Sequence, residues 1–126
     1  MLLDTCALLW LATDHSNLSA RARAAIVDPT HPVFVSAASV WEIAVKYALG
    51  KLPLPSPPRV LVPQIREAHH LEALAFDERD ALTVELLPDA HRDPFDRMLI
   101  AQAIARGLTI LTPDPEFRRY PVGLIW

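Results

Sequence analysis

The chain has 126 residues, of which 52% are hydrophobic and 21% charged, and its formal net charge is −3. This length favours one domain spanning residues 1–126, and the acidic balance excludes a generically basic nucleic-acid binder. A single cysteine, Cys6, excludes an internal disulfide and fits a cytoplasmic protein.

The chain begins with an apolar stretch at residues 1–12 that lacks a basic leader and carries Asp4, so it does not have the pattern of a signal peptide. No apolar run reaches membrane-spanning length, and we expect no membrane association. In chain order, short apolar runs predict strands at residues 1–3, 33–35, 71–75, 109–112 and 122–125. Apolar residues at helical spacing predict helices at residues 5–13, 19–27, 37–49, 57–69, 77–87 and 94–106, with a helical turn at 116–119.

Local signals mark the ends of these helices. The expected N-caps are side chains with an acceptor oxygen, namely Asn17 or Ser19, Ser36, Ser56 and Asp93. Pro94 suits a first helical position because its missing N–H would be unpaired there. Gly50 and Gly107 follow the last residues of two helices, where glycine commonly ends a helix. The proline-rich residues 51–58 are expected to form a stiff loop at the edge of the fold.

Strands that alternate with helices predict an α/β sandwich around a mostly parallel sheet. Ligands of such sheets gather beyond the carboxyl ends of the strands. Asp4 ends the first predicted strand and Asp114 lies just past another, while Glu42 lies two turns into a helix and Asp96 lies in the first turn of a helix. Right-handed crossovers would bring these four acids to one rim of the sheet.

Four crowded carboxylates repel one another unless a cation neutralises them. Oxygen ligands suit Mg²⁺ or Mn²⁺, and such an ion can bind phosphate oxygens and activate water for phosphodiester hydrolysis. Helix capping is the competing interpretation, and it explains Asp93 more readily than Asp96. His91 is interpreted as a solvated loop side chain rather than a ligand.

Basic side chains near the same rim are candidates to bind flanking phosphates of a nucleic acid. Lys46 follows Glu42 by one helical turn, and Arg92 and Arg97 flank the start of the helix that carries Asp96. Arg118 and Arg119 are interpreted as solvated charges.

Other residues near the acids favour structural roles. Trp41 is expected to pack in the core rather than stack on a base, and Cys6 to be a small buried residue. Thr5 and Thr112 adjoin the acids and are candidates to hydrogen-bond them.

Four segments resemble the PIN-domain ribonucleases, and most closely the VapC-like toxins of type II toxin–antitoxin pairs. They are Leu2-Leu3-Asp4-Thr5, Ser39-Val40-Trp41-Glu42-Ile43, His91-Arg92-Asp93-Pro94-Phe95-Asp96-Arg97 and Leu111-Thr112-Pro113-Asp114. The resemblance implies a three-layer α/β/α sandwich and endonucleolytic RNA cleavage with Mg²⁺ or Mn²⁺. It places the metal-binding, catalytic acids at Asp4, Glu42, Asp96 and Asp114, with Asp93 as a secondary acid. It also implies a homodimer inhibited by a small antitoxin.

Three alternatives stay open from the sequence. An aspartate-nucleophile phosphatase would carry a second aspartate two residues after the first, where this chain has Cys6. A non-enzymatic interaction module would use its acids only to cap helices. A housekeeping RNA-processing nuclease would share the same acids as a toxin.

Overall fold

The computed structural model describes residues 1–89 and 93–126. Within this part of the chain, five short strands form one sheet in the order β3-β2-β1-β4-β5. They are β1 (Leu2–Leu3), β2 (Phe34–Ser36), β3 (Glu72–Leu74), β4 (Ile110–Leu111) and β5 (Leu124–Ile125). Every neighbouring pair runs parallel, so the predicted α/β class is confirmed and the sheet is wholly parallel.

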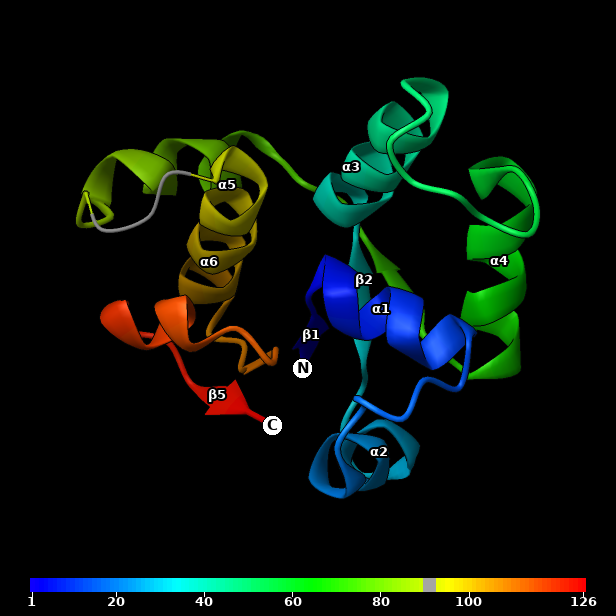
Figure 1. Cartoon of the computed structure of the whole chain (residues 1–126). Coiled ribbons are helices and arrows are strands. Elements are labelled where there is room, and N and C mark those ends of the chain that lie inside the picture. The colour runs from blue at the N-terminus through cyan, green and yellow to red at the C-terminus, as the bar shows by residue number, and fades with distance from the viewer. Residues whose placement is uncertain (90–92) are drawn as a thin grey trace.

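Helices cover both faces of this sheet (Figure 1). The described α-helices are α1 (Thr5–Ala12), α2 (Ala20–Val27), α3 (Ala37–Ala48), α4 (Pro58–Ala68), α5 (Glu78–Thr83) and α6 (Pro94–Arg106), with 3-10 turns η1 (Val84–Leu86) and η2 (Pro115–Arg119). In Figure 1, α4 lies to the right of β2, α1 crosses in front of the strands and α2 lies at the bottom, while α5, α6 and η2 lie on the left. This is a three-layer α/β/α sandwich.

The central strands contribute side chains to two separate apolar cores, because successive side chains of a strand point to opposite faces of the sheet. Leu3 and Leu111 join the cluster that includes the apolar sides of α1 and α2. Leu2 and Ile110 join the cluster that includes α6 and η2. All four strand residues are fully buried, so the two-residue strands β1 and β4 form the centre of the molecule.

The ends of α6 follow the signals in the sequence. The carboxylate of Asp93 accepts from the amides of Phe95 at 2.9 Å and Asp96 at 3.4 Å. Gly107 ends the helix in the left-handed region at φ 65°, which a side chain would disfavour. These two ends fix where Asp96 lies, in the first turn of α6.

Two predicted helix boundaries are wrong. Ser56 does not cap α4: the N-cap is Pro57, and no side chain bonds the first turn. Ser56 lies one residue too early, and Pro58 at the first helical position has no amide that needs a partner. The helix predicted at residues 77–87 is shorter, because α5 ends at Thr83 and tightens into η1. The hydroxyl of Thr83 donates to the carbonyl of Arg79 at 2.9 Å, a bond that competes with regular helix.

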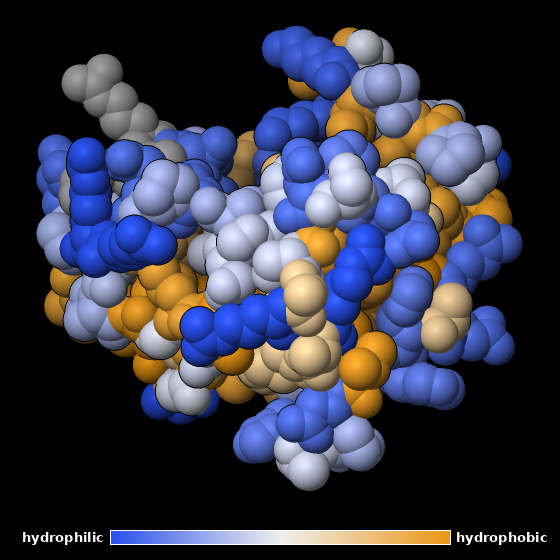
Figure 2. Space-filling model, turned by 60° about the horizontal axis from the view of Figure 1, so that its bottom comes forward, coloured by the Kyte–Doolittle hydropathy of each residue, from blue (hydrophilic) through white to orange (hydrophobic). Residues whose placement is uncertain are grey.

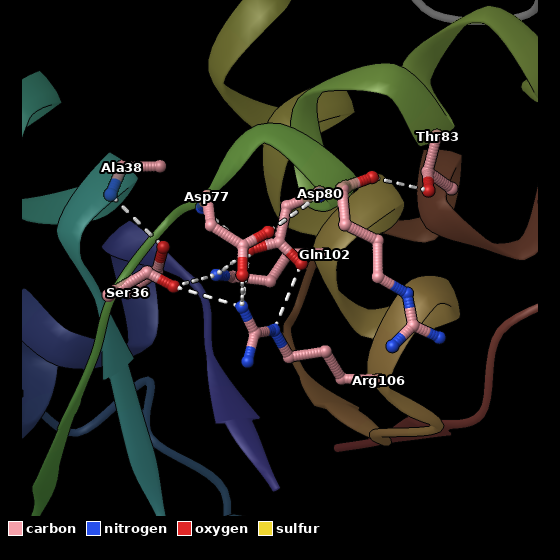
Figure 3. A network of polar contacts seen from close by, with 9 residues as sticks. Ser36, Ala38, Asp77, Asp80, Thr83, Gln102 and Arg106 are labelled. Atoms are coloured by element: carbon pink, nitrogen blue, oxygen red, sulfur yellow. Dashed lines mark hydrogen bonds and ion pairs between the residues drawn. The ribbon is translucent and has the colours of Figure 1, made fainter.

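A buried carboxylate ties α5 to α6 (Figure 3). Asp80 is 0% exposed, and its oxygens accept from Nε and Nη2 of Arg106 at 2.9 Å and from Nε2 of Gln102 at 3.0 Å. Asp80 also completes a capping box with Asp77 at the start of α5. Burial alone would raise the pKa of Asp80, but the Arg106 guanidinium and the other donors outweigh it and lower the pKa. The network therefore holds an ionised carboxylate in the interior.

The surface of the molecule is mixed in character. On the face around α2 and the two chain termini, hydrophilic side chains interrupt the hydrophobic ones (Figure 2). Within residues 1–89 and 93–126, no helix combines the length and apolar character needed to cross a membrane.

Candidate active site

The four acids singled out in the sequence line one cavity of about 270 Å³. Asp4 directly follows β1 and Asp114 lies three residues past β4, and each caps the helical segment that comes next. Glu42 lies in α3, which follows β2, and Asp96 lies in the first turn of α6. Because all strands run parallel, the ends of β1, β2 and β4 meet at one edge of the sheet. The predicted convergence on one rim therefore occurs.

Asp4 is the most buried of these acids, with 4% of its surface exposed. Its oxygens accept from the Ala7 amide at 2.6 Å and from the Thr112 hydroxyl at 2.5 Å. Burial raises the pKa of Asp4 to about 7, and the charges of Asp96 and Asp114 add to this shift while the two hydrogen bonds oppose it. Asp4 is thus a carboxyl group whose anion lacks a compensating positive charge.

Glu42 is also buried, with 6% of its surface exposed, but a positively charged side chain lies next to it. The hydroxyl of Thr5 donates to Oε2 of Glu42 at 2.5 Å, and Nζ of Lys46 forms an ion pair with Oε1. The hydrogen bond to Glu42 raises the pKa of Lys46, and the nearby charges of Asp93 and Asp96 contribute. Lys46 therefore lies at the cavity as predicted, paired to an acid.

A threonine links two of the acids across the sheet edge. The amide of Asp114 donates to Oγ1 of Thr112 at 3.1 Å, and the same hydroxyl donates to Asp4. Oδ1 of Asp114 accepts from the Glu116 amide at 2.8 Å, which starts η2. Thr5 and Thr112 therefore hydrogen-bond the acids, one of the options that the sequence left open for them.

The structure does not place the remaining predicted site residues in the cavity lining. Asp93 caps α6 and does not line the cavity. Arg97 also lies outside the cavity lining, and its Nη1 donates to the carbonyl of Pro88 at 2.9 Å. Arg92 and His91 fall outside the described residues.

Two expectations about side chains near the acids are wrong. Cys6 is exposed and lines the acidic cavity rather than filling the core, because residue 6 of α1 faces away from the sheet. Trp41 is 57% exposed and packs against Phe95 with ring centroids 5.3 Å apart. Its neighbour Glu42 takes the inward direction on α3, which turns Trp41 outward.

The cavity has an apolar wall that sequence reasoning missed. Leu9 and Leu52 contribute to its lining. Leu52 belongs to the proline-rich loop, which was expected only at the edge of the fold. No local signal connects that loop to the acids, since the contact arises from the return of the chain after α3.

A larger cavity of about 740 Å³ contains none of the four acids. Apolar side chains of α3, α4 and β3 line most of it, including Trp41, Val62 and Leu74. Its composition suits an apolar partner rather than phosphate chemistry.

The carboxylates of the acidic cavity are oxygen donors of the kind that a divalent cation binds. Carboxylate oxygens are the ligands that Mg²⁺ and Mn²⁺ prefer. Burial raises the pKa of Asp4, and the charges of Asp96 and Asp114 raise it further, so a cation in the cavity would favour the ionised form. Among the described residues, however, no three acidic, histidine or cysteine side chains lie close enough together to hold an ion as they stand. Asp4, Glu42 and Asp114 each bond their own partner. The residues fit such an ion by chemistry and by their shared cavity, and binding requires their carboxylates to turn inward.

The pKa of the Cys6 thiol depends on the charges of all four acids. Partial burial raises its pKa, and the negative charges of Asp4, Glu42, Asp96 and Asp114 raise it further. We therefore expect Asp4→Asn and Glu42→Gln to lower the Cys6 pKa in metal-free protein. The pH dependence of iodoacetamide alkylation measures this, since the thiolate is the reactive form.

Glu67→Gln is the matched control for this prediction, because it removes one negative charge from the exposed side of α4. It is expected to leave the alkylation profile unchanged. Identical profiles in all three variants would show that the acids do not act on a common space.

The fold and the cavity define a class of protein that comparison with known proteins identifies. The family model described as PIN domain matches residues 1–123. The chain therefore belongs to the PIN-domain family.

Individual relatives agree with this assignment. Ribonuclease VapC16 of Mycobacterium tuberculosis (strain ATCC 25618 / H37Rv) is 33% identical over 117 residues, which cover 88% of this chain and 77% of the relative. The chain is also similar to the solved structure of VapBC2 from Rickettsia felis bound to a DNA fragment from their promoter, with a TM-score of 0.76, 16% identity, and coverage of 98% and 96% of the two chains. For FitAcB from Neisseria gonorrhoeae the TM-score is 0.67 at 22% identity, covering 99% and 96%. At these identities the solved structures support the fold alone.

Proposed function

We propose that this chain is a divalent-metal-dependent endoribonuclease and the toxin of a toxin–antitoxin pair. The observation that carries the proposal is the single cavity lined by Asp4, Glu42, Asp96 and Asp114. A bound Mg²⁺ or Mn²⁺ would supply charge neutralisation at the scissile phosphate and a more acidic water. The similarity to a protein named as a ribonuclease supports RNA as the substrate.

The side chains of the cavity have separable roles in this proposal. Asp4, Glu42, Asp96 and Asp114 would hold the cation. Thr112 and Thr5 orient two of these carboxylates by donating to one oxygen of each. The other oxygens, which contact the Ala7 amide and Lys46, would exchange these partners for the cation. Asp93 acts indirectly, by starting the helix that presents Asp96.

The phosphate-binding role proposed for basic residues is strongest at Lys46. It lines the acidic cavity and needs only to exchange Glu42 for a substrate oxygen. Arg97 lies one residue after Asp96 and serves the same strand of RNA if its contact with Pro88 opens. Arg92 is proposed from the sequence alone.

We also propose that a small antitoxin protein inhibits the enzyme in the cytoplasm and that the active form is a homodimer. The similarity to solved VapBC and FitAB complexes supports an antitoxin. The apolar cavity between α3 and α4 supplies surface for a protein partner. A small upstream reading frame for a DNA-binding protein would favour a toxin over a housekeeping nuclease, the main alternative.

Metal removal tests the proposed reaction. Purified protein and total bacterial RNA are incubated with Mn²⁺, with EDTA, and with EDTA followed by excess Mn²⁺, and the cleaved ends are mapped. Defined cleavage with Mn²⁺, none in EDTA and recovery after metal addition are expected. Cleavage that persists in EDTA, or no cleavage under any condition, would contradict the proposal and favour a non-enzymatic interaction module in the second case.

A further inference from the structure

A second polar cavity, of about 400 Å³, adjoins the acidic cavity. The two share Pro113 and Asp114, the residues that follow β4. The second cavity extends from this shared wall between the start of α2 and the segment formed by η2 and β5. Figure 1 shows α2 and β5 side by side at the bottom of the molecule, on the face that Figure 2 turns forward. The second cavity therefore lies where it could bind a polymer chain that passes through the acidic cavity.

Two arginines line this second cavity, Arg21 from α2 and Arg118 from η2. Both are exposed, and neither forms an ion pair or hydrogen bond within residues 1–89 and 93–126. Their neighbours along the chain differ, since Arg23 is paired with Asp14 at 2.5 Å and Arg119 with Glu116 at 3.1 Å. Of these four arginines, the two that line the cavity are the two without a partner among the described residues.

A buried hydroxyl adds to this arrangement. Tyr120 lines the same cavity and is 5% exposed, and its hydroxyl oxygen has no hydrogen-bond partner among the described residues. A buried polar atom without a partner is costly, and a native structure rarely keeps one without a reason. A ligand that accepts a hydrogen bond in the cavity would give this hydroxyl its missing partner.

We propose that this second cavity binds a phosphate of the RNA backbone next to the scissile phosphate. The inference rests on the proposed ribonuclease function. Guanidinium groups match phosphate oxygens through paired, charge-assisted hydrogen bonds, and the Tyr120 hydroxyl donates a third. The shared wall at Pro113 and Asp114 sets the direction in which the RNA leaves the acidic cavity.

The arrangement also answers how an acidic protein binds RNA. The net charge of −3 offers no general attraction to a polyanion. Two arginines in one cavity concentrate positive charge at a single point of the backbone. They act as substrate-binding residues and not as catalytic ones, because the cleaved bond lies in the neighbouring cavity.

The test uses a synthetic single-stranded RNA that spans the cleavage position mapped in total RNA. The variants are Arg21→Ala/Arg118→Ala and a control with the same charge change, Arg59→Ala/Arg79→Ala. The kcat/KM for cleavage with Mn²⁺ is measured over a series of KCl concentrations. We expect the first variant to lose about tenfold or more in kcat/KM, and its slope of log(kcat/KM) against log[salt] to be shallower by about 0.7, the value for one lost phosphate contact on a single strand. The control is expected to match the wild type.

A second substrate locates the contact. A methylphosphonate beside the cleaved bond removes one backbone charge, and it should weaken cleavage by the wild type while leaving the double variant unaffected. Tyr120→Phe should raise the stability of the free protein, because it deletes an unpaired buried hydroxyl, and should still raise KM.

The outcomes separate the two proposals. Equal losses in both double variants, or unchanged kcat/KM in Arg21→Ala/Arg118→Ala, would overturn the phosphate cavity while leaving the ribonuclease intact. A wild-type protein that cleaves no RNA would overturn the proposed function first.

Discussion

Asp4→Asn is expected to reduce RNA cleavage severely while leaving the fold intact. The variant keeps a side-chain oxygen for the Ala7 amide and so preserves the start of α1. It removes the charge that a cation needs at the centre of the acidic cavity. Loss of several kcal/mol of transition-state stabilisation corresponds to a fall of about 10²–10³-fold in kcat. Cleavage assays and far-UV circular dichroism measure the two effects, and Asp96→Asn should give the same pair of results.

The same substitution is expected to stabilise the metal-free protein. The pKa of Asp4 is about 7 in the folded chain, against 3.8 as its ordinary value. The folded state therefore keeps a proton that the unfolded state has lost, and stability falls as the pH rises from about 4 to about 7. Asp4→Asn removes this loss, so at pH 8 its free energy of unfolding should exceed that of the wild type, by on the order of 2 to 4 kcal/mol.

The control for both effects is Asp28→Asn, a charge change at the exposed end of α2. It should cleave RNA as the wild type does and show the wild-type pH dependence of stability between about pH 4 and 7, because the hydrogen bonds from Thr30 lower the pKa of Asp28 and confine its own contribution to more acidic pH. An Asp4→Asn protein with full activity would remove Asp4 from the catalytic acids. If Asp4→Asn lost cleavage but was no more stable than the wild type at pH 8, a neighbouring group would already neutralise the charge of Asp4.

Asp80→Ala is expected to be strongly destabilising although it lies outside the acidic cavity. It leaves Arg106 and Gln102 without their shared acceptor and breaks the capping box of α5 (Figure 3). Breaking a buried ion pair by removing one partner costs about 3 kcal/mol or more. Urea unfolding followed by circular dichroism should show this as a lower midpoint with an unchanged slope.

Two comparisons interpret that result. Asp77→Ala removes an exposed member of the same network and should cost less, because its contact with Arg106 is open to water. Asp80 also has a lowered pKa, so the stability it provides is present above its ordinary pKa and is lost as the pH falls through the folded value. If Asp80→Ala and Asp77→Ala were equally mild, the network would not be what holds α5 against α6.

The parts of the fold that could be predicted from sequence are those fixed by local chemistry. Asp93, Pro94 and Gly107 bound α6 because capping and backbone conformation act within a few residues. Ser36 starts α3 for the same reason. Ser56 shows the limit, since a suitable capping residue placed one position early cannot reach the free amides.

The sequence was enough to predict which acids lie together at the candidate site, but not which side chains hydrogen-bond them. Asp4 and Asp114 come after strands, Asp96 lies in the first turn of α6, and Glu42 lies in the helix that follows β2. A parallel sheet brings such positions to one edge. The hydrogen bond between Thr112 and Asp4 joins residues 108 positions apart. The outward direction of Trp41 and Cys6 depends on the rotation of α3 and α1 against the sheet. The cavity that holds Arg21 and Tyr120 arises from packing of segments distant in sequence, which no local pattern encodes.

Calorimetric titration of Mn²⁺ tests the central claim most directly, because it measures the common cation site without any assumption about the RNA. Wild-type protein is compared with Asp4→Asn, Glu42→Gln, Asp96→Asn, Asp114→Asn and the charge control Asp28→Asn. We predict saturable binding by the wild type and the control, and weakening by about tenfold or more in each of the four cavity variants. Equal Mn²⁺ affinity in all six proteins, or no binding by the wild type, would contradict the claim that these four carboxylates form one metal site.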